Sequence, residues 1–461
     1  MNDIVLVNPP ISFLETQRGQ NSKKKDGKNK EFLSYPPLGV LYLASSLEKE
    51  GIKVCVIDAP TLGIGVDEIV DMIKKENTTI VGISATTPQT RTAVSLAKLL
   101  GQEYGNSLVI GLGGAHISAD PDFIKQFPFF DFGFVGQGEI TFPKIVKRIL
   151  CGEIVNGIIE GEAPTNLDEV SFPARHLIDM SLYFMPIHVK KFTSIIASRG
   201  CPYNCLYCSR PVIGKHISYR SVKNIINEIE KCKKKYGIEW FQFVDDTMTL
   251  NRGHIFELCH EIINKKIGIE WGCQTRVDLV DKRLLEVMYQ SGCREMSFGI
   301  ESGNERVRSF LNKNFSNETV LNAFQMCKKV GIETNAFMML GLPTEKEAEM
   351  NQTIKFACKI PVNYVEFNLT TPFPGSELFD YSVKNGVVGK DIWNKFANGE
   401  IKDLPNYITN EFGKEELQSK QKQAYKKFYF RPEYILQRIV EDIHSIDKIK
   451  RDVKIAATLL N

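Results

Sequence analysis

Residues 192–208 of the protein read FTSIIASRGCPYNCLYC. A β-branched run leads directly into Cys201, Cys205 and Cys208, which have the spacing C-x3-C-x2-C. One loop that follows a strand can bring three thiolates together around a metal centre. The sequence therefore predicts a strand whose carboxyl end carries a cysteine-rich loop.

Five further strand–helix repeats follow this strand. Each predicted strand is a short run rich in β-branched or aromatic residues, and a segment with helical apolar spacing comes after it. The six strands are expected at residues 192–200, 239–249, 269–278, 294–303, 333–343 and 363–376. Eight repeats close a full barrel, so six predict an open, partial (β/α)6 TIM barrel. Polar residues fall at the predicted strand ends: Asp245, Asp246, Gln274, Arg276, Glu301 and Gly341-Leu342-Pro343.

The first part of the chain shows the same alternation on a smaller scale. Strands are expected at residues 4–10, 53–59, 79–87, 107–116 and 130–139, with helical segments between them. This pattern predicts an α/β fold with a parallel, doubly wound, Rossmann-like sheet, which binds ligands at the carboxyl ends of its strands. The sequence has no G-x-G-x-x-G after the first strand and no G-x-x-x-x-G-K-[ST], which argues against a dinucleotide and against a P-loop.

Four segments are expected along the chain. They are an N-terminal Rossmann-like domain (1–152), a linker (153–190), the partial barrel (191–385) and a helical C-terminal region (386–461). In the last segment, helices are expected at 418–430 and 432–449. The basic stretch RGQNSKKKDGKNKE (18–31) is interpreted as a solvated surface loop, with a binding lid as the alternative.

Charge and cysteine usage limit the classes of function. The 461 residues include 58 Lys and Arg against 55 Asp and Glu, a net charge of +3, which argues against nucleic acid as a main partner. No apolar run approaches the roughly 18 residues that span a membrane, and the N-terminus lacks an export signal, so a cytoplasmic protein is expected. Eleven cysteines, an odd number, then indicate thiols or metal ligands rather than disulfides.

Three cysteines on one loop favour an iron–sulfur cluster over zinc. A structural zinc site takes four ligands, and the nearest candidate for a fourth, His216, lies eight residues beyond Cys208. A [4Fe–4S] cluster with three thiolates leaves one iron open to a chelating ligand. Zinc remains the second interpretation.

The motif C-x3-C-x-aromatic-C, with Tyr207 as the aromatic residue, resembles the signature of the radical S-adenosylmethionine superfamily. This resemblance implies that Cys201, Cys205 and Cys208 ligate a [4Fe–4S] cluster. In that family the amino and carboxylate groups of S-adenosylmethionine chelate the open iron, and one electron cleaves the cofactor to a 5′-deoxyadenosyl radical. The partial barrel is also the fold of the superfamily.

The resemblance further implies roles for the strand-end residues. Asp245 or Asp246 would hold the amino group of S-adenosylmethionine, Arg276 its carboxylate, and Glu301 its ribose or methionyl part. The segment MMLGLPTE (338–345) resembles the motif that packs near adenine. The remaining positions expected at this cofactor are Tyr207, Gln274, Gly341 and Pro343. Alternative interpretations are a helix cap for one aspartate, ion pairing for Arg276 and Glu301, and a plain turn at 341–343.

Several segments of the first part resemble the cobalamin-binding domain that precedes the barrel in class B radical methylases. They are N-P-P after the first strand, Y-P-P-L-G (35–39), G-I-S-A-T-T (82–87), G-G-A-H (113–116) and V-G-Q-G-E (135–139). The implied cobalamin positions are Asn8, Pro9, Pro10, Ser84, Thr86, Thr87, Gly113, Gly114, His116, Gly136, Gly138 and Glu139. The chain lacks D-x-H-x-x-G, so the ligation of cobalt stays open, and His116 is expected at the corrin edge or in a turn. The alternative is a domain whose glycines only serve tight turns.

Taken together, the resemblance implies a cobalamin-dependent radical enzyme, most simply a C-methyltransferase. Its substrate would be a small molecule, a natural product or a lipid, with membrane contact only for a lipid. Its electron donor would be of flavodoxin or ferredoxin type. Alternatives are an oxidative cyclase similar to the anaerobic magnesium-protoporphyrin cyclase, a rearrangement enzyme, and a non-catalytic cobalamin or redox sensor. A methylthiotransferase is disfavoured because only Cys55 and Cys151 precede the barrel.

Overall fold

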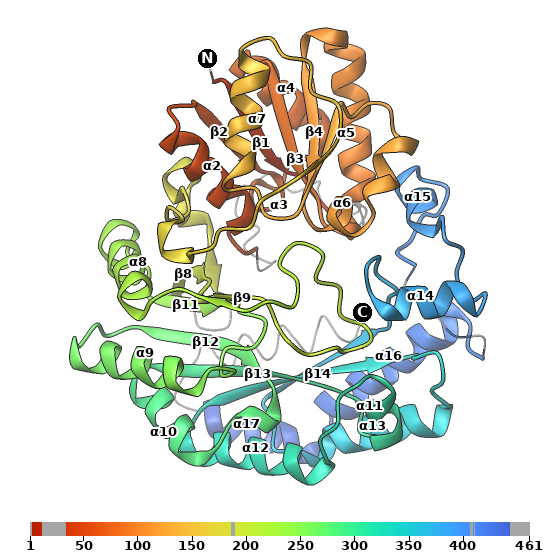
Figure 1. The fold of residues 1–461 in the computed structure, drawn as a ribbon. Coiled ribbons are helices and arrows are strands. Elements are labelled where there is room, and N and C mark those ends of the chain that lie inside the picture. Colours follow the sequence, from red (N-terminus) through yellow and green to blue (C-terminus); the bar gives the residue numbers. More distant parts are fainter. Residues whose placement is uncertain (1, 12–33, 186–189, 406–408, 410, 443–461) are drawn as a thin grey trace. The chain divides into compact units, whose positions relative to one another are not determined.

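A computed structural model describes residues 2–11, 34–185, 190–405, 409 and 411–442 (Figure 1). The chain forms two compact units. The first comprises residues 1–183, 208–220 and 373–405, and the second comprises residues 184–207, 221–372 and 406–461. The basic stretch 18–31, which was expected to be a surface loop, lies outside the described residues.

The first unit is built on six parallel strands in the order β2-β1-β3-β4-β5-β6. The strands are β1 (Ile4–Asn8), β2 (Val54–Asp58), β3 (Ile80–Ser84), β4 (Val109–Gly113), β5 (Phe132–Val135) and β6 (Gly157–Glu160). The order turns back at β1, between β2 and β3, and such a switch point opens a crevice at the carboxyl ends of the strands. The doubly wound sheet predicted for this part is confirmed.

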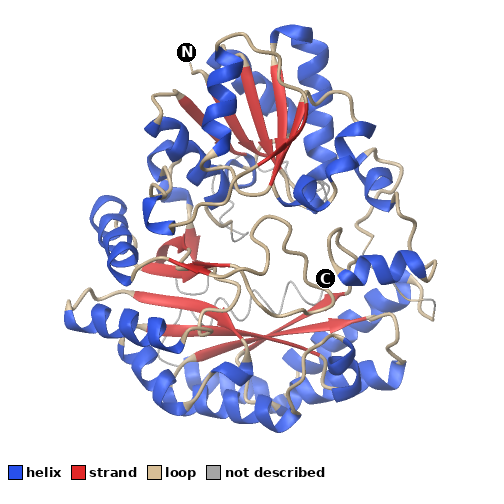
Figure 2. Cartoon of the chain, in the orientation of Figure 1, coloured by secondary structure: helices blue, strands red, loops and turns tan. Residues whose placement is uncertain are grey.

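Both faces of this sheet are covered, because apolar residues occupy successive positions along its strands. In β1, Val5 and Val7 pack into one core, whereas Ile4 and Leu6 pack into another. Helices flank the strands on both sides in Figure 2. The helices between the strands are α2 (Leu38–Lys49), α3 (Ala59–Leu62), α4 (Val66–Glu76), α5 (Thr90–Tyr104), α6 (Ala115–Ala119) and α7 (Thr141–Leu150).

The segment expected to be a linker takes part in both sheets. Its residues 157–160 form β6, which pairs in parallel with β5, and Phe184–Met185 form β7, which pairs antiparallel with β8. Both strands are short and lie at sheet edges, so they lack the long apolar pattern that would reveal them in the sequence. The domain boundaries at 152, 190 and 385 stay a prediction.

Residues 373–405 pack into the first unit. Their helices are α14 (Glu377–Lys384) and α15 (Ile392–Ala397), and Ala397 joins the core that contains Val5. The Arg91 side chain on α5 donates to the Phe396 and Lys402 carbonyls, at 3.0 and 2.8 Å. Contacts so distant in sequence leave no local pattern in the chain.

The second unit contains a seven-stranded sheet in the order β15-β14-β13-β12-β11-β8-β7. The strands after β7 are β8 (Lys190–Ile195), β11 (Trp240–Phe243), β12 (Glu270–Thr275), β13 (Cys293–Glu301), β14 (Glu333–Leu340) and β15 (Tyr364–Leu369). These six are parallel, as the partial barrel requires, and only β7 runs antiparallel. The predicted partial barrel is thus confirmed.

Helices line the outer side of this curved sheet (Figure 1). They are α8 (Val222–Tyr236), α9 (Arg252–Asn264), α10 (Lys282–Gln290), α11 (Glu305–Phe310), α12 (Asn317–Val330) and α13 (Glu347–Lys359). Local sequence fixes where several begin. The side chains of Ser221, Asn251, Asp281 and Ser316 each accept the backbone N–H three residues later, which caps α8, α9, α10 and α12. None of the helices in the described ranges combines the length and apolar character needed to cross a bilayer.

The open edge of β15 is covered by side chains from α16 (Lys414–Tyr429). The Tyr429 hydroxyl lies 3.0 Å from both the N–H and the carbonyl of Val365, and Tyr425 bonds both backbone groups of Phe367 at 3.1 and 3.3 Å. Four helical residues rise about 6 Å and two strand residues about 6.6 Å, so the two repeats match. The following helix α17 (Pro432–Asp442) adds a bond from Tyr434 to the Asn363 carbonyl. Residues 443–449, expected to be helical, lie outside the described residues.

We expect Tyr429→Phe to loosen this edge, because the buried backbone groups of Val365 lose their partner. The free energy of unfolding should fall by about 1 kcal/mol, and the Val365 amide should exchange its hydrogen faster. Hydrogen–deuterium exchange measures the second effect directly. Tyr289→Phe, on the surface of α10, is the matched control and should leave β15 unchanged. Equal exchange at Val365 in both variants would show that α16 does not hold the edge.

Candidate functional site

The cysteine loop follows β8 in the second unit. Cys201 is buried, Cys205 and Cys208 are half-buried, and none of the three is paired in a disulfide. The Cys201 sulfur lies 3.6 Å from the Thr247 hydroxyl, just beyond β11.

The donor set of this loop suits an iron–sulfur cluster. Among the described residues, no three His, Cys, Asp or Glu side chains gather as they would around one metal ion. The thiolates of a [4Fe–4S] cluster bind three different irons, so they need not converge on one point. Three thiols on one loop, without the histidine or second cysteine pair of a zinc site, have the chemistry of that cluster.

Asp245 holds the start of the loop in place. Its carboxylate is buried at the end of β11 and accepts hydrogen bonds from the Ala197 amide at 3.1 Å and from the Ser198 hydroxyl at 2.6 Å, as well as from the Ser198 amide. Burial raises the pKa of Asp245 to about 6, and these bonds act in the opposite direction. Asp246, the next residue, is exposed. Gln274 bonds the Asp245 carbonyl at 3.3 Å.

Arg276 lies at the end of β12 with an unused donor. Its guanidinium makes two bonds to Asp278, at 2.9 and 2.8 Å, and lies 3.9 Å from the centre of the Tyr203 ring. The remaining Nη1 atom is buried and has no hydrogen-bond partner among the described residues. A buried donor without a partner is costly, and a guanidinium matches a carboxylate. This arrangement fits the expected contact with the carboxylate of S-adenosylmethionine.

Glu301, the last residue of β13, connects the sheet to the cysteine loop through a hydrogen bond. One of its carboxylate oxygens accepts from the Tyr207 hydroxyl at 2.6 Å and from the Lys313 ammonium at 2.7 Å. Sequence reasoning missed Lys313, which follows α11 and gives no motif of its own. Burial raises the pKa of the Cys205 thiol, while the positive charges of Lys313 and Arg276 oppose that rise.

The turn 341–343, expected near adenine, is held by Glu345. Its carboxylate accepts the amides of Gly341 and Leu342 at 2.9 and 3.2 Å. Burial raises the pKa of Glu345 to about 7, and its second oxygen has no hydrogen-bond partner among the described residues. Sequence reasoning singled out the turn but not Glu345, although a glutamate just after a G-L-P turn could have indicated it.

In the first unit, polar side chains connect the carboxyl ends of β1 and β2. Asn8 donates to Asp58 at 2.7 Å, the Tyr183 hydroxyl donates to the other Asp58 oxygen at 2.5 Å, and Gln89 donates to Asn8 at 2.9 Å. Burial raises the pKa of Asp58. Gln89 also bonds the Pro9 carbonyl at 2.5 Å. Asn8 and Pro9 are predicted cobalamin residues, whereas Asp58 and Tyr183 were missed because they lie far apart in sequence.

The two glycines after β4 have different surroundings. Gly114 has a positive φ of 99°, and a Cβ there would lie 2.7 Å from the Ala85 carbonyl oxygen, so this position needs glycine for protein packing. At Gly113 the nearest atom to such a Cβ is 4.0 Å away, which leaves room beside the backbone. Gly113 therefore fits the close approach of a flat macrocycle, and Gly114 is explained without one.

His116 is wholly buried in α6. Its Nδ1 lies 3.2 Å from the Thr87 hydroxyl, and its ring meets Phe123 edge-on at 4.4 Å. Burial lowers the pKa of His116 to about 3, so the imidazole is neutral, and its Nε2 has no hydrogen-bond partner among the described residues. With no exposed surface, the ring ties the ends of β3 and β4 together in this conformation.

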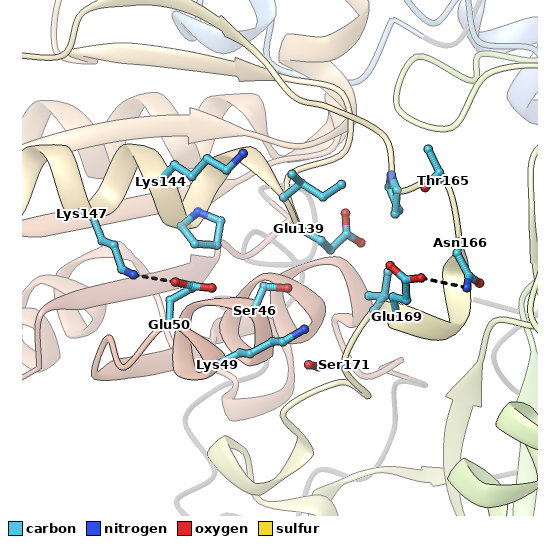
Figure 3. A pocket seen from close by; sticks show the side chains of 14 residues that line it. Ser46, Lys49, Glu50, Glu139, Lys144, Lys147, Thr165, Asn166, Glu169 and Ser171 are labelled. Carbon is cyan, nitrogen blue, oxygen red and sulfur yellow. Dashed lines mark hydrogen bonds and ion pairs between the residues drawn. The ribbon is translucent and has the colours of Figure 1, made fainter.

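The remaining predicted cobalamin residues do not share one site. Thr86 bonds Gln89 through its amide and its hydroxyl, at 2.9 and 2.7 Å, at the end of β3 where Ser84 also lies. Glu139 instead lines a charged hollow of about 340 Å³ between α2, α7 and residues 164–171 (Figure 3). No other predicted cobalamin residue lines this hollow. The others are Pro10, whose carbonyl accepts from Thr92, Gly136, whose amide donates to Ser118, and Gly138, which packs against Leu43.

Comparison with known proteins gives this geometry a family. Residues 195–357 match the model of the radical SAM superfamily, and residues 32–146 match the B12 binding domain. An uncharacterized methyltransferase of Pyrococcus horikoshii is 31% identical over 435 residues, which cover 91% of this chain and 93% of that protein. The chain belongs to the B12-domain radical SAM proteins. Its fold class, S-adenosylmethionine, the iron–sulfur cluster and cobalamin, all predicted from sequence, are thereby confirmed as properties of these two domains.

Two further comparisons extend this similarity. The anaerobic magnesium-protoporphyrin IX monomethyl ester cyclase of Rubrivivax gelatinosus is 28% identical over 369 residues, covering 75% of this chain and 66% of the cyclase. A solved radical S-adenosylmethionine methyltransferase from Kitasatospora setae, with cobalamin and a [4Fe–4S] cluster bound, superposes with a TM-score of 0.63. It shares 16% identity and covers 84% of this chain and 76% of its own, so it supports the fold alone. The individual site residues stay predictions.

We expect Arg276→Gln to weaken the binding of S-adenosylmethionine about tenfold or more, because a charged hydrogen bond to the carboxylate is lost. Equilibrium dialysis with the anaerobically reconstituted protein measures this. Iron content should match the wild type. Arg294→Gln, on the adjacent strand β13, is the control and should bind normally. Unchanged affinity in the Arg276 variant would remove that residue from the cofactor site.

The buried His116 should make the first unit less stable in mild acid. The unfolded histidine takes up a proton below about pH 6.5 and the folded one only near pH 3, so stability is complete above 6.5 and falls as the pH drops. The slope should approach about 1.4 kcal/mol per pH unit. Urea unfolding at roughly pH 5 and pH 7 tests this. The slope should shrink in His116→Leu and persist in His260→Gln, whose histidine is exposed; an equal slope in both refutes the argument.

Proposed function

We propose that this protein is a cobalamin-dependent radical C-methyltransferase that methylates an unactivated carbon of a small molecule, natural product or lipid. The observation that carries the proposal is its relationship, over nine-tenths of both chains, to a methyltransferase that also spans both units. The two domain matches support a radical SAM enzyme, and its likeness to methyltransferases comes from this relative. The carbon target and the substrate are the proposed part.

The residues proposed to hold the cofactors lie at the strand ends already described. Cys201, Cys205 and Cys208 would ligate the [4Fe–4S] cluster, Arg276 would bind the carboxylate of S-adenosylmethionine through its free Nη1, and Asp246 its ammonium. When bound, the reduced cluster supplies the electron that cleaves S-adenosylmethionine, and cobalamin carries the methyl group. Glycine at position 113 would let the macrocycle approach the end of β4.

The protein's own groups mainly fix positions. Asp245 secures the backbone just before the cysteine loop, and Glu345 holds the turn that would lie against adenine. In the first unit, the Asn8–Asp58–Tyr183 bonds fix the ends of β1 and β2. Rigid strand ends keep reacting groups aligned, which is the main contribution a protein makes to cofactor-driven chemistry.

The proposed partners follow from the reaction. Radical SAM enzymes need a reductant and a substrate, and we propose an external one-electron donor of flavodoxin or ferredoxin type. Contact with a membrane surface is proposed only if the substrate is a lipid. The cytoplasmic location stays a prediction.

A second candidate function is an oxidative cyclisation. Its support is the similarity to the Rubrivivax gelatinosus cyclase over three-quarters of this chain. A non-catalytic sensor is the third possibility considered from sequence, and the intact set of three thiols argues against it.

The co-products distinguish these candidates. Each C-methylation should consume two molecules of S-adenosylmethionine, giving equal amounts of 5′-deoxyadenosine and S-adenosylhomocysteine. Reconstituted protein, reductant, cobalamin and a small-molecule extract of the source cells would be analysed by mass spectrometry. Equal amounts support methyl transfer, 5′-deoxyadenosine alone supports the cyclase, and the absence of both supports a sensor.

Cysteine variants control this experiment. Cys205→Ala should abolish both co-products because the cluster loses a ligand. Cys151→Ala, an exposed cysteine of the first unit, should behave as the wild type. Full activity and full iron content in Cys205→Ala would contradict the assignment of the cluster to this loop.

A further inference from the structure

The short connection between α11 and α12 is hydrogen-bonded to the cysteine loop. The Leu206 amide donates to the Leu311 carbonyl at 3.2 Å, and the Asn312 side chain donates to the Asn204 carbonyl at 2.9 Å. Asn312 adopts a positive φ of 59°, an uncommon conformation for a residue other than glycine. Two consecutive residues of the connection thus bond the segment between Cys201 and Cys208.

The third residue, Lys313, reaches the same loop through Glu301. Its ammonium is buried and lies 2.7 Å from the Glu301 carboxylate and 2.8 Å from the Gly299 carbonyl. The same Glu301 oxygen accepts the Tyr207 hydroxyl at 2.6 Å. The ammonium also lies 5.5 Å from the centre of the Tyr207 ring. Lys313 therefore touches Tyr207 both through Glu301 and across its ring.

The surroundings make this ion pair essential to the local arrangement. Leu206 and Tyr207 pack against an apolar cluster that includes Leu311, Met339 and Leu342. The side chains of Glu301 and Lys313 are each only 6% exposed. Removing one partner of a buried pair leaves the other charge uncompensated, which is strongly unfavourable. Without Lys313, the Glu301 carboxylate would lose its counter-charge, and the position of Tyr207 would be less firmly fixed.

We propose that Lys313 is a positioning residue for the iron–sulfur cluster: it fixes Tyr207 through Glu301 and places a positive charge beside the cluster ligands. Tyr207, whose hydroxyl shares a Glu301 oxygen with the Lys313 ammonium, directly precedes the cluster ligand Cys208 in the sequence. A nearby positive charge favours the more negative, reduced state of a cluster, and the effect is strong where water is excluded. The proposal rests on the cluster of the proposed function, but not on methyl transfer.

The test is the midpoint potential of the cluster, measured by a redox titration followed by electron paramagnetic resonance on the anaerobically reconstituted full chain. Lys313→Met should make reduction at least tenfold less favourable, a fall of about 59 mV for one electron. Glu301→Gln should shift the potential upward, because it removes a negative charge. The midpoint potential of Lys313→Arg should stay near that of the wild type, because the positive charge is kept. Arg306→Met, which removes an exposed arginine in α11, is the control and should also keep the wild-type potential.

The opposite signs separate an electrostatic role from a merely structural one. A structural role alone predicts loss of iron without opposed shifts, so potentials that move in the same direction, or not at all, in loaded Lys313→Met and Glu301→Gln overturn the proposal. If Lys313→Met binds no cluster at all, two other variants decide. The proposal is supported if the midpoint potential rises in Glu301→Gln and if Lys313→Arg binds a full cluster. Any other pair of results overturns the proposal. Failure of the wild type to form a cluster would instead refute the proposed function.

Discussion

The buried carboxylate of Asp245 is the constraint on which the second unit's site depends. A carboxylate taken out of water must be satisfied by hydrogen bonds, and this one is satisfied by the backbone and side chain at Ala197 and Ser198. The end of β11 is thereby tied to the exit of β8, three residues before Cys201. The cysteine loop therefore leaves the sheet from a fixed point. This fixed start determines where the loop lies relative to Arg276 and Glu301 on the following strands.

Both units place their polar groups by the same physical rule. Parallel strands end together at one edge, where backbone groups lack a ladder partner and side chains must replace it. In the first unit the Gln89 side chain does this for the Pro9 carbonyl, and in the second Asp245 and Glu345 do it for the amides of Ala197 and Gly341. Residues that complete the protein's own backbone are therefore distinct from those with a spare donor, such as Arg276, which are left to meet a ligand.

Sequence periodicity and one motif predicted much of this architecture. The six parallel strands β8 and β11 to β15 and the loop at 201–208 follow from local apolar runs and cysteine spacing, which tertiary contacts reinforce rather than override. The edge strands β6 and β7 could not be predicted in this way, because β7 has only two residues and the side chains of β6 are mostly exposed. Lys313 and Tyr183 were missed for another reason: each acts on a carboxylate 12 or 125 residues away in the chain, and no local pattern records such a pairing.

The tyrosines of α16 protect the exposed edge strand of the open barrel. A sheet that stops at six parallel strands presents an edge ready to recruit a strand from another molecule. A phenolic hydroxyl both donates and accepts, so a single side chain can occupy the N–H and the carbonyl of one edge residue at once. Tyr425 and Tyr429 therefore do for β15 what a further strand paired with it would do, with a helix that offers no backbone edge of its own. The sheet ends in a surface that cannot be extended, which protects the protein from aggregation through that side.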